Sequence, residues 1–167
     1  MHNEAMAWVA KHATSDPITV LDLGGRFVNG SPRGLFPNAT VYTVLDQVPA
    51  RDVEVVADAA VWDPGERRWQ VVVCCEVLEH AFQWPAICRT AWRALAPGGR
   101  LIVTTAAPGR APHSGHDGGP LRPGEYYANI EPDRLRDALS VAGFADITVD
   151  VEPVSADVRA VATRPLP

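Results

Sequence analysis

Apolar residues gather in seven short runs along the chain, and polar or helix-forming segments separate these runs. The runs VVVCC and LIVTT are almost continuously apolar or β-branched, as strands covered on both faces are. The other runs have similar lengths and lie between turn-forming residues. The pattern therefore predicts seven strands, at Thr19–Leu23, Thr40–Leu45, Val53–Ala57, Val71–Cys75, Leu101–Thr105, Ile147–Val151 and Val158–Thr163.

Three segments carry apolar residues at helical spacing, namely Asn3–His12, Pro85–Leu95 and Pro132–Ala142. The stretch Pro97-Gly98-Gly99 follows the second segment as an end signal, and Gly143 follows the third as a C-terminal cap does. Because strands and helices alternate, the pattern predicts an α/β fold with right-handed crossovers between parallel strands.

Two connections depart from this alternation. Only PVSA separates the last two predicted strands, which is too short for a parallel crossover and predicts an antiparallel hairpin. The Gly-, Pro- and His-rich segment 108–129 is long, and it follows the fifth strand on the side where open α/β sheets bind ligands. We expect a single domain over residues 1–167, with residues 1–17 as an N-terminal helix that acts as a lid and 108–129 as a substrate-side loop.

Composition narrows the classes of function. The net charge is −5 and no basic run exists, so we expect no nucleic-acid partner. The chain has no stretch of about 18 apolar residues, so no membrane span is predicted. The first residues lack the charged-then-apolar order of a signal peptide. Cys74 and Cys75 are neighbours in a predicted strand and point to opposite faces, and Cys88 lies in a predicted helix. This usage predicts no disulfide framework and a cytoplasmic location.

Acidic and glycine residues stand at the ends of successive predicted strands. The first strand runs into Asp22-Leu23-Gly24-Gly25, the second ends at Asp46, the third precedes Asp58, and the fourth precedes Glu76. Glycines let the backbone approach a ligand without a Cβ in the way. An acidic residue at the end of the second strand can accept hydrogen bonds from both hydroxyls of a ribose.

This ordered set, together with the terminal hairpin, resembles the class I S-adenosylmethionine (SAM) dependent methyltransferases, in particular small single-domain members. The resemblance covers Val20 to Thr163. It implies a Rossmann-like, mostly parallel sheet of order 3-2-1-4-5-7-6 with helices on both faces. It also implies SAM as the cofactor and a transferase that moves a methyl group to a small molecule by in-line displacement.

The resemblance further implies roles for residues at the strand ends. Asp58 matches the residue that accepts from the adenine amino group, and Ala59 offers its N–H to a ring nitrogen. Gln47 or Trp62 covers the adenine face, and the backbone near Cys74 and Cys75 faces the methionyl ammonium. The residues expected to bind the cofactor are Asp22, Gly24, Gly25, Asn29, Ser31, Asp46, Gln47, Asp58, Ala59, Cys75 and Glu76.

The glycine loop departs from the family pattern, because RFVN is inserted between Gly25 and Gly30. Asn29-Gly30 is expected to form a tight turn. Ser31 as a cap and Pro32 at the first helical position predict a short helix start, which would face the methionyl carboxylate. Arg33 is a candidate partner of that carboxylate, with a solvated arginine as the alternative.

Methyl transfer requires alignment of the acceptor with the methyl group and exclusion of water, and a base only when the acceptor carries a proton of high pKa. The candidate catalytic residues are His80, His113, His116 and Tyr126. One alternative is a metal-assisted O-methyltransferase, because Glu76-x-x-Glu79-His80 resembles a metal-binding string of small-RNA 2′-O-methyltransferases. In that alternative His113 or His116 completes the metal shell.

Two further alternatives come from other classes of protein. A nicotinamide oxidoreductase would also use an acidic residue such as Asp46 to bind ribose hydroxyls, but it should show a compact glycine fingerprint. A SAM-binding regulatory or interaction module without turnover is motivated by the altered glycine loop. Because no separate recognition domain is predicted, we expect a small acceptor or an acceptor presented by a partner protein. The sequence leaves a homodimer open, and it does not distinguish oxygen, nitrogen and carbon acceptors.

Overall fold

The computed structural model describes residues 1–167 and contains one seven-stranded sheet of order β3-β2-β1-β4-β5-β7-β6. This order confirms the predicted topology. The first five strands pair in parallel, whereas β7 pairs antiparallel with both β5 and β6. The strands are β1 (Thr19–Leu23), β2 (Val41–Asp46), β3 (Val55–Val56), β4 (Trp69–Cys75), β5 (Leu95–Ala106), β6 (Ala145–Glu152) and β7 (Asp157–Thr163).

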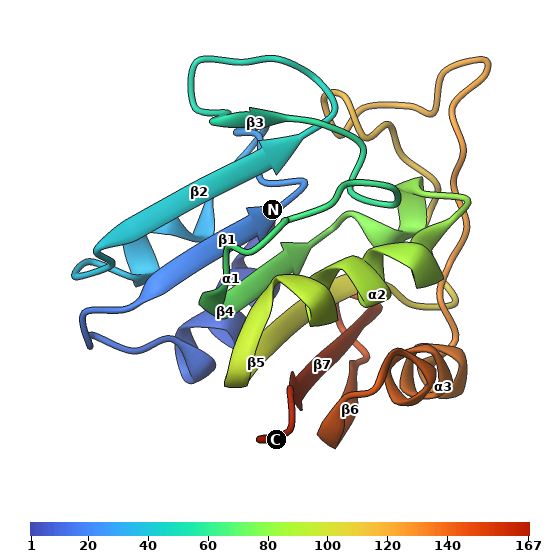
Figure 1. Ribbon diagram of the computed structural model, residues 1–167. Coiled ribbons are helices and arrows are strands. Elements are labelled where there is room, and N and C mark those ends of the chain that lie inside the picture. Colours follow the sequence, from blue (N-terminus) through green and yellow to red (C-terminus); the bar gives the residue numbers. More distant parts are fainter.

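Three α-helices and two short 3-10 helices connect the strands. In Figure 1, α2 and α3 lie in front of the sheet and α1 lies behind it, so both faces are covered as predicted. The connection from β1 to β2 contains only the 3-10 helix η1. The helices are α1 (Asn3–His12), η1 (Pro32–Leu35), η2 (Leu78–His80), α2 (Trp84–Ala94) and α3 (Pro132–Ala142).

Alternation along the central strands divides the core between the two faces. In β4, Val72 and Cys74 belong to the core beneath α2 and α3, whereas Val71 and Val73 pack with residues of α1. Successive strand side chains point to opposite faces, so an almost continuously apolar strand fills both layers. Cys88 lies buried on α2 beside Cys74 in the same core cluster, and all three cysteines are free, as predicted.

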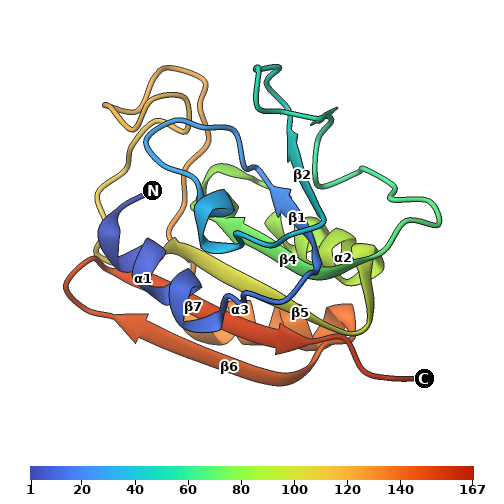
Figure 2. The same ribbon diagram turned by 90° about the vertical axis from the view of Figure 1, so that its left-hand side faces the viewer.

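The loops that follow β1, β2 and β5 gather at one end of the sheet, in the upper half of Figure 2. This is the end at which the parallel strands finish, and ligands bind there in open α/β sheets. The loop 108–129 bends over it from β5, and hydrogen bonds hold the loop in place. Ser114 Oγ donates to Glu125 (2.7 Å), and the Ala128 N–H donates to the Glu79 carbonyl (2.8 Å). No helix of the chain has the length and apolar character that a membrane crossing requires.

The fifth strand begins earlier than predicted. Helix α2 ends at Ala94 and β5 starts at Leu95, so Pro97-Gly98-Gly99 lies inside the strand. Gly98 donates to the Arg164 carbonyl, and the Arg164 N–H donates back to Gly99. Gly98 keeps the left-handed conformation of a turn residue, with φ +76°. The register with β4 shifts between Leu95 and Arg100, so these residues form an irregularity in β5 that bonds to the segment after β7. The third strand is shorter than predicted, since only Val55–Val56 pairs with β2.

Candidate functional site

Two adjoining cavities lie where the parallel strands end. The first, of about 340 Å³, contains Asp58 and is named the Asp58 cavity. The second, of about 370 Å³, contains Arg110 and is named the Arg110 cavity. Their volumes lie in the range of small-molecule sites. Six residues line both cavities and mark their junction, namely Gly24, Arg26, Asp46, Glu76, His80 and Gly115.

The Asp58 cavity has partly apolar walls, with eight hydrophobic residues among 19, so it suits a flat, weakly polar group. Leu45, Val77 and Ile87 supply apolar surface. The predicted cofactor residues Gln47, Asp58 and Ala59 lie here. The predicted catalytic residues His116 and Tyr126 also lie here, beside Asp58 rather than in the second cavity.

The Arg110 cavity is polar, with three hydrophobic residues among 19, so it suits a charged or strongly hydrogen-bonding ligand. It contains the predicted residue His113, which comes from the loop 108–129. Further predicted residues of its wall are Asp22, Gly25, Asn29 and Cys75.

The turn after β1 depends on two glycines. Both N–H groups donate to the Leu45 carbonyl, at 2.7 Å from Gly24 and 3.3 Å from Gly25. Gly24 has φ +71°, and a Cβ there would overlap the Val77 side chain. A Cβ on Gly25 would overlap the Asp22 carboxylate. The turn therefore requires glycine at both positions, because a Cβ would collide with the protein itself, and its backbone lines the cavities.

Asp46 ends β2 at the shared wall, with its side chain 13% exposed. Its Oδ1 accepts from the Val48 N–H (2.9 Å), and its Oδ2 accepts from the Arg26 N–H (3.3 Å). These bonds fix the carboxylate, and each oxygen keeps a further lone pair for a ligand. Asp46 is therefore a fixed carboxylate at the wall shared by the two cavities.

Asp22 is a buried carboxyl beneath the glycine turn. Its Oδ2 accepts from the Tyr42 hydroxyl (2.8 Å), and its side chain packs under Gly25. Burial raises the pKa of Asp22 from 3.8 to about 7, and the Tyr42 hydrogen bond opposes this rise. Asp22 is therefore part of the support of the turn.

We expect Asp22→Asn to change the pH dependence of stability. Because the folded-state pKa is raised, the stabilising contribution of Asp22 is complete below about pH 4 and is lost as the pH rises toward 7. Asparagine keeps the acceptor for Tyr42 without the charge. Between pH 5 and pH 8 the free energy of unfolding of the variant should therefore rise relative to that of wild type by about 3 kcal/mol. Urea unfolding of both proteins at pH 5 and pH 8 measures this gain. A constant difference between the two pH values would contradict the buried-carboxyl interpretation.

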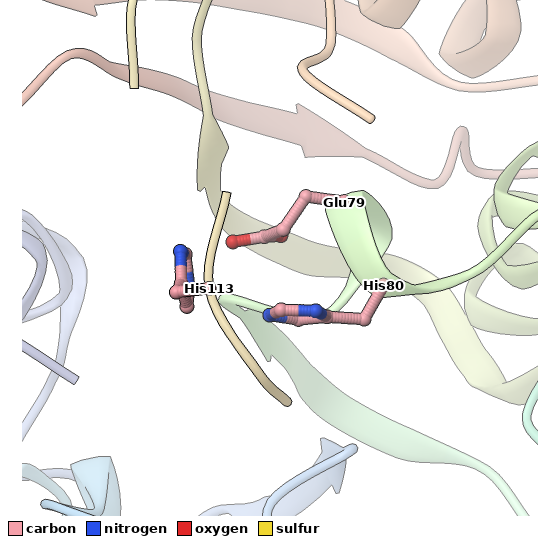
Figure 3. A group of neighbouring side chains, drawn as sticks. All are labelled: Glu79, His80 and His113. Atoms are coloured by element: carbon pink, nitrogen blue, oxygen red, sulfur yellow. The ribbon is translucent and has the colours of Figure 1, made fainter. Parts of the chain in front are cut away.

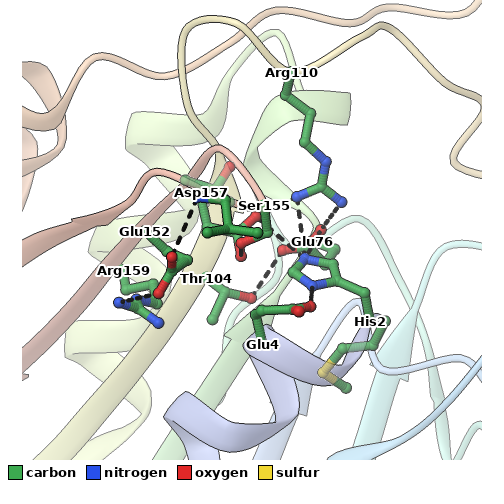
Figure 4. Close-up of polar contacts among 12 residues, drawn as sticks. His2, Glu4, Glu76, Thr104, Arg110, Glu152, Ser155, Asp157 and Arg159 are labelled. Carbon is green, nitrogen blue, oxygen red and sulfur yellow. Dashed lines mark hydrogen bonds and ion pairs between the residues drawn. The ribbon is translucent and has the colours of Figure 1, made fainter.

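Arg110 joins three segments beside the second cavity (Figure 4). Its guanidinium donates to Glu76 Oε2 (2.8 Å) and to Asp157. Asp157 is fully buried, and the Glu76 side chain is 11% exposed. The His2 ring adds contacts to Asp157 (3.2 Å) and Glu76 (3.5 Å). The hydrogen bond to Asp157, and to a smaller extent that to Glu76, raises the pKa of His2 to about 10.

Glu76 is held in an uncommon backbone conformation, with φ +57°. Its Oε1 accepts from Thr104 (3.0 Å), while Oε2 is bound to Arg110. Burial opposes ionisation, but the His2 hydrogen bond and the Arg110 charge lower the pKa of Glu76 to about 2. A positive φ outside glycine is tolerated when surrounding contacts fix the residue, and it is frequent at functional sites. Glu76 is thus an ionised, fixed carboxylate at the junction of the cavities.

Glu79, His80, His113 and Tyr127 form a second group at the edge of the Arg110 cavity. The His80 and His113 ring centroids are 4.9 Å apart, and the Tyr127 ring contacts both. Burial, with the neighbouring charge of Glu76, raises the pKa of Glu79 to about 8. Burial also lowers the pKa of His80 to about 4, so its ring is neutral at pH 7. A neutral imidazole can accept a proton or bind a ligand through its lone pair.

Three expectations require correction. Ser31 lines neither cavity, because its hydroxyl accepts from the Arg33 N–H (3.2 Å) and caps η1. Arg33 pairs with Glu54 (2.9 Å) and lies over the Tyr42 ring, so it does not face the site. Trp62 packs on Trp69, with ring centroids 6.0 Å apart, and leaves Gln47 as the candidate cover of the Asp58 cavity.

The structure also changes the ligand set of the metal-binding alternative. Glu76 cannot join Glu79 and His80 as a free ligand, since Arg110 and Thr104 bind its oxygens. His116 lies on the Asp58 side, whereas His113 meets His80.

Sequence reasoning missed Arg26 and Arg110. Arg26 lies in the inserted RFVN, lines both cavities and donates to the carbonyls of Gly115 (3.5 Å) and His116 (3.4 Å) in the loop. Its position in the insertion was the available signal. Arg110 had no local signal, because its partners Glu76 and Asp157 are distant in sequence and meet it only in the folded chain.

A family model described as a methyltransferase domain matches residues 1–149 of the chain. No curated protein matches.

Solved structures resemble the whole chain. One is a 1,6-didemethyltoxoflavin-N1-methyltransferase from Burkholderia thailandensis with bound S-adenosylhomocysteine (SAH), at 18% identity and TM-score 0.69, covering 98% of this chain and 77% of that one. Another is CalS10, a SAM-bound amino pentose methyltransferase from Micromonospora echinaspora, at 17% identity and TM-score 0.71, covering 96% and 90%. A third is the N-methyltransferase NodS from Bradyrhizobium japonicum WM9 with SAH, at 16% and 0.66, covering 97% and 86%. At these identities the likeness shows a shared fold.

Proposed function

The chain belongs to the methyltransferase domain family, and from this premise we propose that it transfers a methyl group from SAM to a small acceptor bound in the Arg110 cavity. The observation that carries the proposal is the position of Asp46. This carboxylate stands at the wall shared by a partly apolar cavity and a polar one, beside a glycine turn. A nucleoside attached to an amino acid requires this order of surfaces, with its ribose at the junction. Similar folds with bound SAM or SAH support the assignment.

The residues present fit this cofactor. Asp46 would accept from the ribose hydroxyls, and Asp58 and Ala59 would meet the adenine edge. Glycine at positions 24 and 25 allows the close turn beside Asp46, because a Cβ at either position would overlap Val77 or Asp22. Glu76 lines both cavities, and Thr104 and Arg110 fix its carboxylate beside the expected methionyl part.

When bound, SAM supplies an electrophilic methyl group whose departure needs no proton. The chain must therefore orient the acceptor and exclude water. The loop 108–129 contributes to the walls of both cavities, through Gly115 and His116 on one side and His113 and Ser114 on the other. Arg26 joins this loop to Asp46, which its Nε approaches at 3.9 Å. We propose that the loop encloses the acceptor beside the methyl group.

The acceptor is proposed to be small and polar. The walls of the Arg110 cavity are mostly charged or hydrogen-bonding, and its volume is about 370 Å³, part of which the methionyl group would occupy. His80 and His113 lie at the edge where an acceptor would meet the methyl group. Their imidazoles are the groups best placed to orient the acceptor or take its proton.

We expect His113→Ala to lower turnover by about 10²-fold while leaving SAM affinity unchanged within about twofold. His113 lines the Arg110 cavity and is absent from the Asp58 cavity, so its loss removes an acceptor contact and spares the adenosine contacts. Calorimetric SAM titration and a methyl-transfer assay with a screened acceptor measure the two effects. A loss of SAM affinity as large as the loss of turnover would place His113 among the cofactor contacts instead.

A thermal-shift titration tests the proposed cofactor. A ligand at about 100 times its Kd adds roughly 2.7 kcal/mol of stability, which is about 5–10 °C for a domain of this size. We expect this rise with SAM and with SAH and none with NAD. A rise with NAD alone would favour the oxidoreductase alternative, and no rise with any of them would contradict the proposal.

A SAM-binding module without turnover is the second candidate, because RFVN lengthens the glycine turn relative to the family pattern. Against this candidate, Gly24 and Gly25 still form a close turn in which a Cβ would overlap Val77 or Asp22. Conversion of SAM to SAH in the presence of an acceptor would exclude this candidate. Tight SAM binding without conversion across a broad screen of amines, hydroxyl compounds and carbon acids would favour it.

A further inference from the structure

Three ligand-type side chains converge at the edge of the Arg110 cavity. Glu79 and His80 lie on η2, and His113 comes from the loop 108–129 (Figure 3). One carboxylate oxygen and one nitrogen from each ring all lie within 4.8 Å of one another. Residues more than 30 positions apart in sequence thus present their polar atoms to one point.

The cluster leaves buried polar atoms without partners. Glu79 is fully buried, and its Oε2 accepts from Thr105 (2.8 Å), but its Oε1 has no partner. His80 Nδ1 and the Tyr127 hydroxyl are buried and also lack partners. An unsatisfied buried polar group costs about 1–3 kcal/mol, and more when it is charged. Glu79 Oε1 therefore points to a ligand that accepts its lone pairs.

Neighbouring groups orient two of the three side chains as metal ligands are oriented. His113 Nδ1 lies 3.2 Å from the Ala111 carbonyl, which can only accept, so Nδ1 carries the proton and Nε2 keeps its lone pair. Thr105 donates to Glu79 and leaves the other oxygen free. Hydrogen bonds of this kind, behind the ligands, fix ring and carboxylate orientation in metal sites.

We propose that Glu79, His80 and His113 form a three-ligand site for a divalent transition metal of the Zn²⁺ type. Two imidazoles and one carboxylate match the ligand set of open zinc sites and suit Zn²⁺, Co²⁺ or Ni²⁺, whereas Mg²⁺ prefers oxygen ligands alone. Arg110 is the nearest competing cation, and its charge is already balanced by Glu76 and Asp157. The other acidic group with a histidine, His2 with Glu76 and Asp157, is occupied by that same guanidinium and carries no such site.

The position of the site suggests its use. His80 lines both cavities and His113 lines the Arg110 cavity, so an open coordination position would face the acceptor. A metal there would lower the pKa of a bound hydroxyl or water and polarise an acceptor oxygen. This role rests on the proposed methyl transfer, whereas metal binding itself does not.

Cobalt provides the probe, because Co²⁺ replaces Zn²⁺ and absorbs visible light according to its ligands. Chelator-treated protein without SAM is titrated with CoCl₂, and ZnCl₂ and MgCl₂ are added as competitors. We expect one equivalent of Co²⁺ to bind, displaced by Zn²⁺ and not by Mg²⁺ at the same concentration. His113→Ala and Glu79→Gln should each weaken binding at least about 10-fold.

His116→Ala is the matched control, since His116 lies in the same loop, has a 52% exposed side chain and belongs to no such cluster. It should bind Co²⁺ as wild type does. Substitution of the buried Glu79 also perturbs folding, so His113→Ala, on the loop, decides the outcome once its unfolding transition matches wild type. No stoichiometric Co²⁺ binding, equal binding by His113→Ala, or equal displacement by Mg²⁺ would each overturn the proposal. A separate SAM titration of the same samples distinguishes failure of the metal-site proposal from failure of the methyltransferase assignment.

Discussion

Asp46→Ala is expected to weaken SAM binding by about 100-fold or more. A hydrogen bond to a charged group contributes about 1.5–3 kcal/mol, and Asp46 is placed to accept two from the ribose. The Val48 and Arg26 N–H groups hold its carboxylate at the junction of the two cavities, so no neighbouring side chain can take over its position. The loss should therefore appear in cofactor affinity and not only in rate.

Isothermal calorimetry with SAM on wild type and Asp46→Ala measures this loss. Asp137→Ala is the matched control, because Asp137 is exposed on α3 and lines neither cavity. The control should bind SAM within about twofold of wild type. If Asp46→Ala bound SAM as tightly as the control, the cofactor would have to lie elsewhere, and the assignment of both cavities would be wrong.

Arg110→Ala is expected to lower the free energy of unfolding by about 3–5 kcal/mol, because removal of one partner leaves buried charge uncompensated. Asp157 is fully buried and Glu76 nearly so, and both depend on this guanidinium. For a domain of this size the loss corresponds to a fall of about 10 °C in Tm. Since Glu76 also lines both cavities, SAM affinity should fall in the same variant.

Arg122→Ala is the control for this effect. Arg122 lies in the same loop and pairs with Asp117, but both side chains are more than half exposed, so the pair contributes at most about 1 kcal/mol. Thermal and urea unfolding compare the two variants with wild type. Equal stability of Arg110→Ala and Arg122→Ala would show that His2 and Ser155 satisfy Asp157 without Arg110.

Strand and helix positions followed from the sequence where a local pattern fixed them. Asn3–His12 and Pro132–Ala142 form helices with the predicted bounds, since their apolar stripes meet a core. Gly143 ends α3 in the left-handed conformation, with φ +102°, as its position predicted. By contrast, Pro97-Gly98-Gly99 lies within β5 as an irregularity without register partners on β4, and hydrogen bonds to Arg164 after β7 keep it in the strand.

Candidate site residues were predictable to the extent that the fold brings strand ends together. Asp22, Gly24, Asp46 and Asp58 all line a cavity, because parallel strands finish at one edge of the sheet. Ser31 caps η1 as its position predicted, but it lies outside both cavities. Arg33, for which a ligand carboxylate and solvent were both open, pairs with Glu54 instead.

The sequence by itself determined the positions of most strands and helices, the terminal hairpin and the acidic residues at the strand ends. These features depend on periodicity, connection length and local turns, which neighbouring residues decide, whereas the strand order was implied by the resemblance to class I methyltransferases. Only the tertiary structure decided that Arg110 binds Glu76 and Asp157, and that His113 joins Glu79 and His80 while His116 does not. The physical reason is that buried charges and lone pairs choose partners by distance after folding, and the path of the long loop 108–129 sets those distances.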